Sequence, residues 1–146
     1  MEKCKVIIDT NLWVSLLIGK KLLEMRALCD DTRLSIYTCD KLNDEFLNVS
    51  LRTKVRRYVT EQSISDVLRL ITSSCINTQV LVNAISTIRD RNDLYLLSLA
   101  DTISANYLIT GDKDLLILQH HNQTKIVTYT GFMTILGTMD CGSSPQ

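Results

Sequence analysis

The sequence predicts an α/β protein with three layers, in which helices cover both faces of a central, mainly parallel sheet of four to five strands. Short apolar runs that suit buried strands alternate along the chain with about seven segments whose apolar residues recur at helical spacing. This alternation favours a parallel sheet, because the connecting helices have to cross back over its faces. At 146 residues the chain is long enough for one such domain and too short for two.

The first half of the chain predicts two strands and three helices. A β-branched run over residues 4–8 indicates a strand that ends at Asp9. Leucines recur at near-helical spacing over residues 12–28, and Gly19 predicts a break between two helices there. A second strand is expected over residues 34–37. The helix that follows has an apolar stripe made of Leu42, Phe46 and Val49.

The second half continues the alternation and ends in a tail. The expected elements are a helix around residues 67–71, a strand over 76–82, a helix over 94–103, a strand over 107–109, a helix over 114–118, a strand over 125–129 and a helix over 130–136. We therefore expect a single domain over residues 1–137 and a flexible tail over residues 138–146, which contains the only proline.

Composition narrows the function classes. Sixteen basic residues balance sixteen acidic ones, so nucleic-acid binding by bulk charge is excluded and would need a local patch. The only basic cluster is either a solvated helix face or a rim that grips phosphates. It consists of Arg52, Lys54, Arg56 and Arg57.

Location and packing follow from a few residue types. No apolar run approaches the length that spans a bilayer, and the N-terminus does not read as a signal peptide, so no membrane association is expected. The five scattered cysteines suit a reducing cytoplasm and neither a disulfide framework nor a zinc site.

Trp13 is expected in the core or between subunits. Adjacent histidines diverge, so His120 and His121 are expected at a solvated helix end.

Acidic residues stand at the ends of two predicted strands, in the first turn of one helix and on the apolar stripe of another. Asp9 follows the first strand, Asp112 follows the strand over residues 107–109, Asp93 lies in the first turn of a helix, and Glu45 shares the apolar stripe of its helix. Parallel strands place their carboxyl ends at one edge of a sheet, where ligands bind. A set of hard oxygen donors suits Mg²⁺ or Mn²⁺.

Simpler interpretations of these acids remain open at this point. Asp112 and Asp114 can cap a helix and stabilise the positive end of its dipole, and Glu45 can reach water from the edge of its stripe. Gly-x-Gly-x-x-Gly and Walker motifs are absent, so a nucleotide cradle is not expected.

Four segments in the same order resemble the PIN domain, in the branch of toxins from toxin–antitoxin pairs. They are Asp9-Thr-Asn11 after an apolar strand, Asp44-Glu-Phe46, Arg89-Asp-Arg-Asn-Asp93, and Tyr107-Leu-Ile-Thr-Gly-Asp-Lys-Asp-Leu-Leu116. The resemblance runs from about residue 5 to about residue 136.

The resemblance implies a metal-dependent endoribonuclease that hydrolyses single-stranded RNA with one or two Mg²⁺ or Mn²⁺ ions. It further implies a homodimer and a cognate antitoxin protein. Its acidic site would consist of Asp9, Glu45, Asp93 and Asp112, with Asp114 as an outer metal ligand, Asn11 and Thr110 as supporting residues, and Arg52, Lys54, Arg56 and Arg57 as RNA-binding residues.

Two other functions stay open. One is a catalytically silent module that binds RNA or protein. The other is a phosphotransferase with Asp9 as nucleophile, although that chemistry usually brings a second Asp two residues later, where this chain has Asn11.

Overall fold

A computed structural model describes residues 3–139, apart from the side chain of Asn92. Within this part the strands form one six-stranded sheet in the order β3-β2-β1-β4-β6-β5, with only β5 antiparallel to its neighbour. The strands are β1 Cys4–Ile8, β2 Leu34–Thr38, β3 Ile76–Asn77, β4 Tyr107–Ile109, β5 His120–His121 and β6 Thr124–Val127. The helices are α1 Thr10–Ile18, α2 Leu22–Asp30, α3 Asp40–Ser50, α4 Thr53–Arg56, α5 Glu61–Ser74, α6 Arg91–Ile103, α7 Lys113–Leu116 and α8 Tyr129–Thr138.

Alternation along the central strands divides the core between the two faces of the sheet. Val6 and Ile8 pack in one apolar cluster, while Ile7 between them packs in the other. In the same way Leu108 and Ile109 of β4 belong to opposite clusters. All five side chains are at most 2% exposed, so both faces of the central strands are covered.

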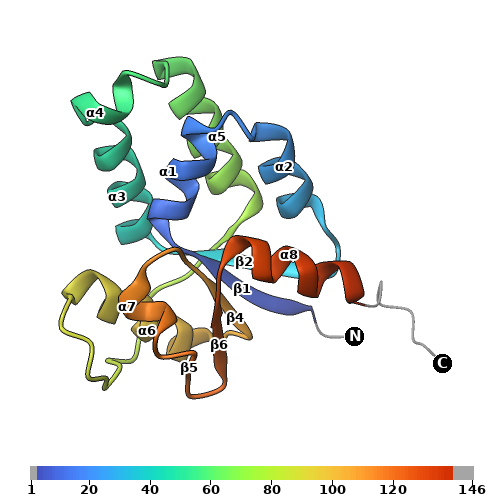
Figure 1. Ribbon diagram of the computed structural model, residues 1–146, viewed down its shortest axis with the longest axis vertical. Helices are drawn as coiled ribbons and strands as arrows, with labels where there is room; N and C mark the ends of the chain where they lie inside the picture. The colour runs from blue at the N-terminus through green and yellow to red at the C-terminus, as the bar shows by residue number, and fades with distance from the viewer. Residues whose placement is uncertain (1–2, 140–146) are drawn as a thin grey trace.

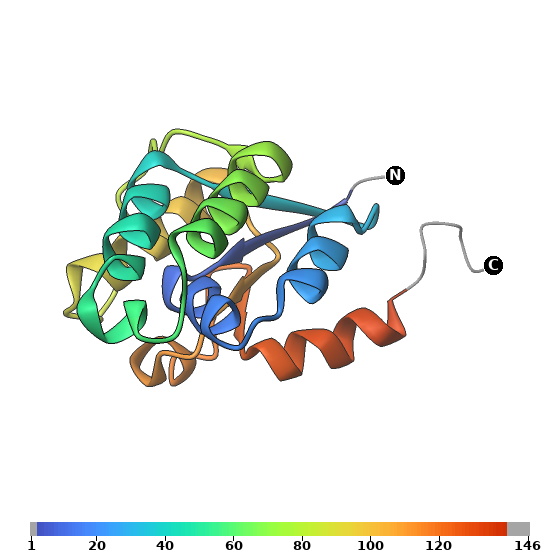
Figure 2. The ribbon, with the colours of Figure 1, turned by 90° about the horizontal axis from the view of Figure 1, so that it is seen from above.

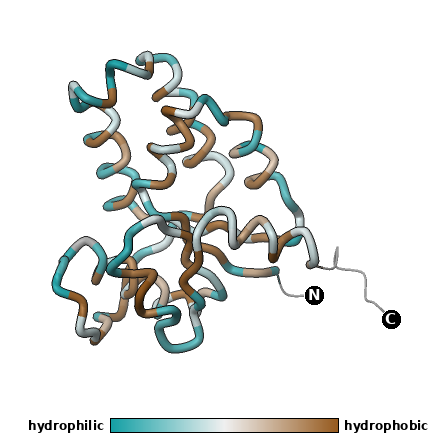
Figure 3. The backbone as a smooth tube through the Cα atoms, in the orientation of Figure 1, coloured by the Kyte–Doolittle hydropathy of each residue, from teal (hydrophilic) through white to brown (hydrophobic). Residues whose placement is uncertain are grey.

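The helices form an uneven sandwich around this sheet. Helices α1 to α5 and α8 supply the core of one face, and α6 and α7, together with Leu42 of α3, supply that of the other. Figure 1 shows α1 to α5 above the strands and α6 and α7 below them, and Figure 2 shows the same upper helices from above. In Figure 3 the brown, hydrophobic backbone follows the central strands, as expected where a sheet is buried on both faces. The expected three-layer α/β fold is confirmed.

The sheet has more strands than the four to five expected, because very short strands extend it. β3 covers only Ile76–Asn77, although a strand was expected over residues 76–82. Beyond it, the segment 78–90 has no regular secondary structure. After Thr78, whose N–H still donates to Thr38 O of β2, three backbone N–H groups of this segment find side-chain acceptors on α6. Leu81 N and Val82 N donate to Thr102 Oγ1, at 3.1 and 3.3 Å.

The prediction that His120 and His121 lie at the end of a helix is wrong. His120 and His121 form strand β5, which pairs with β6 through a tight turn in which Asn122 has a positive φ of 52°. His121 Nε2 lies 3.0 Å from Asp101 Oδ2 on α6, so the hairpin is fastened to that helix. The leucines before the two histidines predict a helix that continues to them. The contact with Asp101 and the pairing with β6 favour a strand instead.

The first helices and the C-terminal end lie close to the expected bounds. Gly19 ends α1, as expected. Trp13 is 4% exposed and packs in the core of its own chain, so it is not available as a contact between subunits. α8 extends to Thr138, one residue into the expected tail, and residues 140–146 of that tail lie outside the described residues. No helix in the described part of the chain is both long and apolar enough to cross a bilayer.

The strand order places a topological switch beside β1. The chain leaves β1 towards β2 and β3 on one side, and returns to β4 on the other. Helical connections then run over opposite faces of the sheet, which opens a crevice at the carboxyl ends of β1 and β4. Asp9 and Asp112 both follow these strand ends.

Candidate metal centre

Asp9 is a buried acid fixed between two strand ends. It follows β1 directly, acts as the N-cap of α1 and is 3% exposed. Its Oδ1 accepts a hydrogen bond from Asn11 N at 3.2 Å, and its Oδ2 accepts one from Thr110 Oγ1 at 2.7 Å. Thr110 is one of the residues expected to support the acidic site. Its hydroxyl group holds the Asp9 carboxylate in one orientation through this hydrogen bond.

Thr110 also fixes the turn that carries Asp112. The backbone N–H of Asp112 donates to Thr110 Oγ1 at 3.0 Å. A threonine hydroxyl can donate one hydrogen bond and accept others, so Thr110 joins the two turns through a single oxygen atom. Asp112 then acts as the N-cap of α7, where its Oδ1 accepts from Asp114 N at 2.8 Å.

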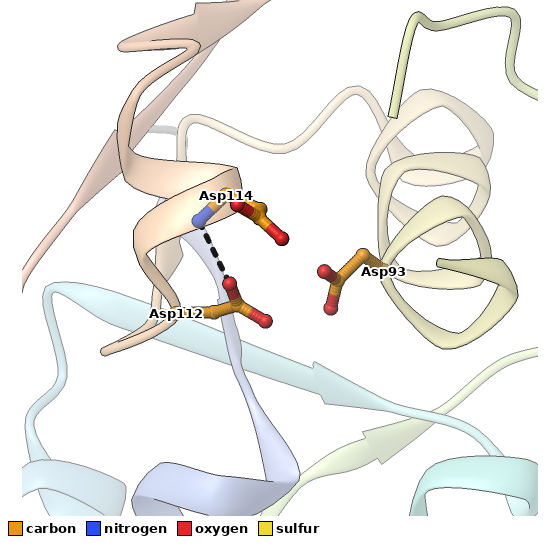
Figure 4. A group of neighbouring side chains, drawn as sticks. All are labelled: Asp93, Asp112 and Asp114. Carbon is orange, nitrogen blue, oxygen red and sulfur yellow. Dashed lines mark hydrogen bonds between the residues drawn. The ribbon is translucent and has the colours of Figure 1, made fainter. Parts of the chain in front are cut away.

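Asp93 approaches these acids from the opposite helix. It lies in the first turn of α6 and is 5% exposed, and its Oδ2 is buried without a hydrogen-bond partner. Figure 4 shows its carboxylate directed towards Asp112 and Asp114 on α7. One carboxylate oxygen from each of these three residues lies within 4.8 Å of the others. A buried oxygen with no donor is costly unless a cation or water satisfies it.

A cavity of about 190 Å³ brings the predicted acids together. Asp9, Glu45, Asp93 and Asp112 all line it, and they come from the end of β1, from α3, from α6 and from the turn after β4. Asn11 also lines the cavity. Asp114 does not belong to this lining and joins the group through Asp93 and Asp112.

The predicted basic cluster divides in the structure. Among the described residues that line the cavity, Arg52 is the only basic one. Arg56 turns towards Glu61, with Nη1 3.7 Å from Oε1. Lys54 and Arg57 are exposed on the surface around α4. Arg52 lies between α3 and α4, as the N-cap residue of α4. At this position it lines the cavity together with Glu45 and Val49 of α3.

Asp90 lines the cavity as well and is not among the site residues that the sequence predicts. It stands three residues before Asp93, just ahead of α6. The available signal was the local density of acids in Asp90-Arg-Asn-Asp93, which helix capping alone could explain.

The electrostatics of the cavity disfavour charge on two of its acids, Asp93 and Asp9. Burial, followed by the hydrogen bond and charge of neighbouring Asp112, raises the pKa of Asp93 to about 7. Burial also raises the pKa of Asp9, an effect that the hydrogen bond from Thr110 opposes and the charge of Asp112 reinforces. A divalent cation would relieve this repulsion and satisfy the free oxygen of Asp93, and the donors are the hard oxygens that Mg²⁺ and Mn²⁺ prefer.

The stability of the metal-free protein should depend on pH through Asp93. Its pKa rises from an ordinary 3.8 to about 7 on folding, so the native state holds a proton that the unfolded state releases in this window. Stability should therefore be highest below about pH 4 for this group and fall as pH rises towards 7. Asp93→Asn should remove part of that fall, on the order of a few kcal/mol. Urea unfolding in EDTA at several pH values measures the free energy of unfolding of the wild-type protein and of Asp93→Asn. The same pH dependence in both proteins would contradict the raised pKa of Asp93.

Comparison with known proteins agrees with this geometry. The family described as PIN domain matches residues 5–114, a range that includes all four predicted acids. A protein of Methanocaldococcus jannaschii described as uncharacterized is 30% identical over 129 residues, which cover 83% of this chain and 79% of that relative. No solved structure matches the chain at a comparable level. The chain therefore belongs to the PIN domain family, whose members are generally nucleases and typically bind divalent metals.

Proposed function

We propose that this protein is a metal-dependent endoribonuclease that hydrolyses phosphodiester bonds of single-stranded RNA. The observation that carries the proposal is the meeting of four acids from four separate elements in one cavity, with a buried oxygen of Asp93 left unsatisfied. Helix capping explains an acid at one helix end. It does not explain why acids from α3, α6 and two strand ends converge on one place.

The proposed metal ligands are Asp9, Glu45, Asp93 and Asp112, with Asp114 as an outer member. These residues would hold one or two Mg²⁺ or Mn²⁺ ions, which would supply a water-derived nucleophile at neutral pH and offset charge on the phosphodiester. The chain itself supplies preorganisation. Thr110 fixes Asp9, and the cap of α7 holds one oxygen of Asp112, while the other points towards Asp93 in Figure 4.

Arg52 is proposed to orient the substrate. It is exposed and lines the acidic cavity, so it can contact an RNA phosphate while the acids handle the metal. A positively charged contact is needed here, because the acidic cavity and the phosphodiester would otherwise repel each other.

The geometry argues against Asp9 as the nucleophile of a phosphotransferase. Both of its carboxylate oxygens accept hydrogen bonds, and the residue is 3% exposed. Each oxygen keeps a second lone pair that can bind a small cation. Attack on phosphorus needs room for a whole phosphoryl group beside the carboxylate, which a side chain that is 3% exposed does not offer. A silent binding module remains the alternative, and an activity measurement separates it from a nuclease.

Cleavage of single-stranded RNA should depend on a divalent cation and on the acids of the cavity. We expect Glu45→Gln and Asp93→Asn each to lower the cleavage rate by at least about 100-fold in Mn²⁺, as when one preorganised charge-stabilising group is lost. Asp44→Asn is the matched control for Glu45→Gln, since Asp44 precedes Glu45 on α3 and is exposed. Rates come from the time course of a labelled oligonucleotide. Equal rates in Glu45→Gln and Asp44→Asn would place catalysis elsewhere, and RNA binding without cleavage would favour the silent module.

Arg52 and Arg56 should differ in their effect on RNA affinity. Arg52→Ala should weaken binding and lower the slope of log affinity against log salt by about 1, as expected when one phosphate contact is lost. Arg56→Ala should leave the slope nearly unchanged, because Arg56 turns towards Glu61. Fluorescence anisotropy in the Glu45→Gln background avoids cleavage during titration. An unchanged slope in Arg52→Ala would show that its position at the cavity has no role in binding.

We further propose that the protein is the cytoplasmic toxin of a toxin–antitoxin pair and acts as a homodimer that an antitoxin inhibits. The support is the PIN family together with the resemblance to its toxin branch. Since Trp13 is buried in its own chain, a dimer has to use exposed apolar residues such as Leu23 of α2, which is 82% exposed. We expect a dimer mass by light scattering, and growth arrest on induced expression in a bacterial host that Glu45→Gln abolishes. A monomer mass would contradict the homodimer but not the toxin role. Normal growth of the host during expression would contradict the toxin role.

A further inference from the structure

Two cysteines that are far apart in the sequence meet beside the upper helices, away from the acidic cavity. Cys29 lies near the end of α2, and Cys75 follows α5 as its C-cap residue 46 positions later in the chain. Both are free, Cys75 belongs to the buried apolar cluster of this face, and Cys29 packs against that cluster. Each thiol is the main hydrogen-bonding and electrostatic influence on the pKa of the other, so the two lie close together. Helices α2 and α5 pack against each other and therefore bring the two thiols into the same neighbourhood.

A small pocket gives solvent access next to this pair. It has a volume of about 160 Å³ and lies between the same two helices. Its lining includes the chain neighbours of both cysteines, Asp30 beside Cys29 and Ser74 beside Cys75. Arg26 and Arg69 also line it and are exposed, so a small anionic reagent in this pocket would meet two guanidinium groups beside the residues that flank the cysteines.

The two thiols are not equivalent. The hydrogen bond from Cys75, with help from the charge of Arg26, lowers the pKa of Cys29 in spite of burial and of Asp30. The pKa of Cys75 is raised by the same hydrogen bond and by burial. Cys29 is half-buried, whereas Cys75 is 8% exposed. A thiolate is the attacking species in exchange reactions, so Cys29 suits the first attack and Cys75 the second.

We propose that Cys29 and Cys75 form a reversible redox site that is oxidised by low-molecular-weight disulfides. In the first step the Cys29 thiolate attacks one sulfur of the small disulfide, forms a mixed disulfide and releases one small thiolate. In the second step Cys75 loses its proton and attacks Cys29 Sγ, which releases the second small thiol. The protein loses two electrons and two protons, and the small disulfide is reduced to two thiols. The product joins α2 covalently to α5.

Peptide mapping of the whole protein tests this pairing directly. Trypsin should place Cys29 in the peptide of residues 27–33 and Cys75 in that of residues 70–89, and each of these peptides contains one cysteine. After reduced protein is incubated with glutathione disulfide and free thiols are blocked, we expect these two peptides to be joined. The oxidised protein should melt roughly 10 °C above the reduced one, because the bond closes a long loop of the unfolded chain. Dithiothreitol should reverse both changes.

Single variants separate the two steps. Cys75→Ala, which suits a buried site, should stop at one glutathione attached to Cys29, and Cys29→Ser should leave Cys75 unmodified. Arg26→Gln should slow the first step several-fold at fixed pH, because a positive charge near the thiolate is lost. Cys4→Ser is the matched control, since Cys4 is another half-buried cysteine, and it should leave the cross-link intact. Circular dichroism checks that each variant folds.

Three results would overturn the site. The first is a cross-link that joins other cysteine peptides. The second is a Cys75→Ala variant that accumulates no mixed disulfide at Cys29. The third is an oxidised protein that melts below the reduced one, which would mean that the bond distorts the native contact.

Discussion

The hydroxyl group of Thr110 connects the two strand ends on which the acidic cavity depends. It donates to Asp9 at 2.7 Å and accepts from the backbone of Asp112 at 3.0 Å. Asp9 N in turn donates to Ile109 O at 2.9 Å, so β1 and β4 stay paired up to the point where their acids begin. Two buried or half-buried carboxylates can be held close together here because their turns are fixed by hydrogen bonds, not by attraction between the side chains themselves.

The hydrophobic core compensates for the free-energy cost of holding these acids close together. Two apolar clusters, one on each face of the sheet, bury the carboxyl-terminal halves of the central strands, and their hydrophobic contribution offsets the cost of gathering acids at one edge. Asp93 is the clearest sign of that cost, since its pKa is raised to about 7 and one of its oxygens is buried without a partner. Local destabilisation of this kind is common where a site is built to bind a charged ligand.

The cavity and the cysteine pair use the same layer of helices in different ways. α1 and α3 bring Asn11 and Glu45 to the cavity, while α2 and α5 carry the two thiols near their C-terminal ends. Helices α1, α2 and α5 share one apolar cluster, so a bond between α2 and α5 would tie together part of the scaffold that supports α1. Such a bond would act on the rigidity of the layer and would leave the charges of the cavity unchanged.

Much of the fold could be predicted because local pattern and final structure agree. The β-branched run before Asp9, the break at Gly19 and the apolar stripe of Leu42, Phe46 and Val49 were all visible in the sequence. Each reflects the period of a strand or a helix, which a short window contains in full. Tertiary contacts decided the short elements, such as β3, whose following segment bonds to α6, and β5, where His121 meets Asp101.

The sequence by itself determined which acids stand at strand ends and on helix faces, together with their order, and that order carries the resemblance to the PIN domain. Only the tertiary structure decided that Asp9, Glu45, Asp93 and Asp112 line one cavity, that Asp90 joins them, and that Arg52 lies there while Arg56 turns towards Glu61. It also decided that Cys29 meets Cys75. The physical reason is that strand order and helix packing set these distances, and both depend on burying apolar surface from the whole chain.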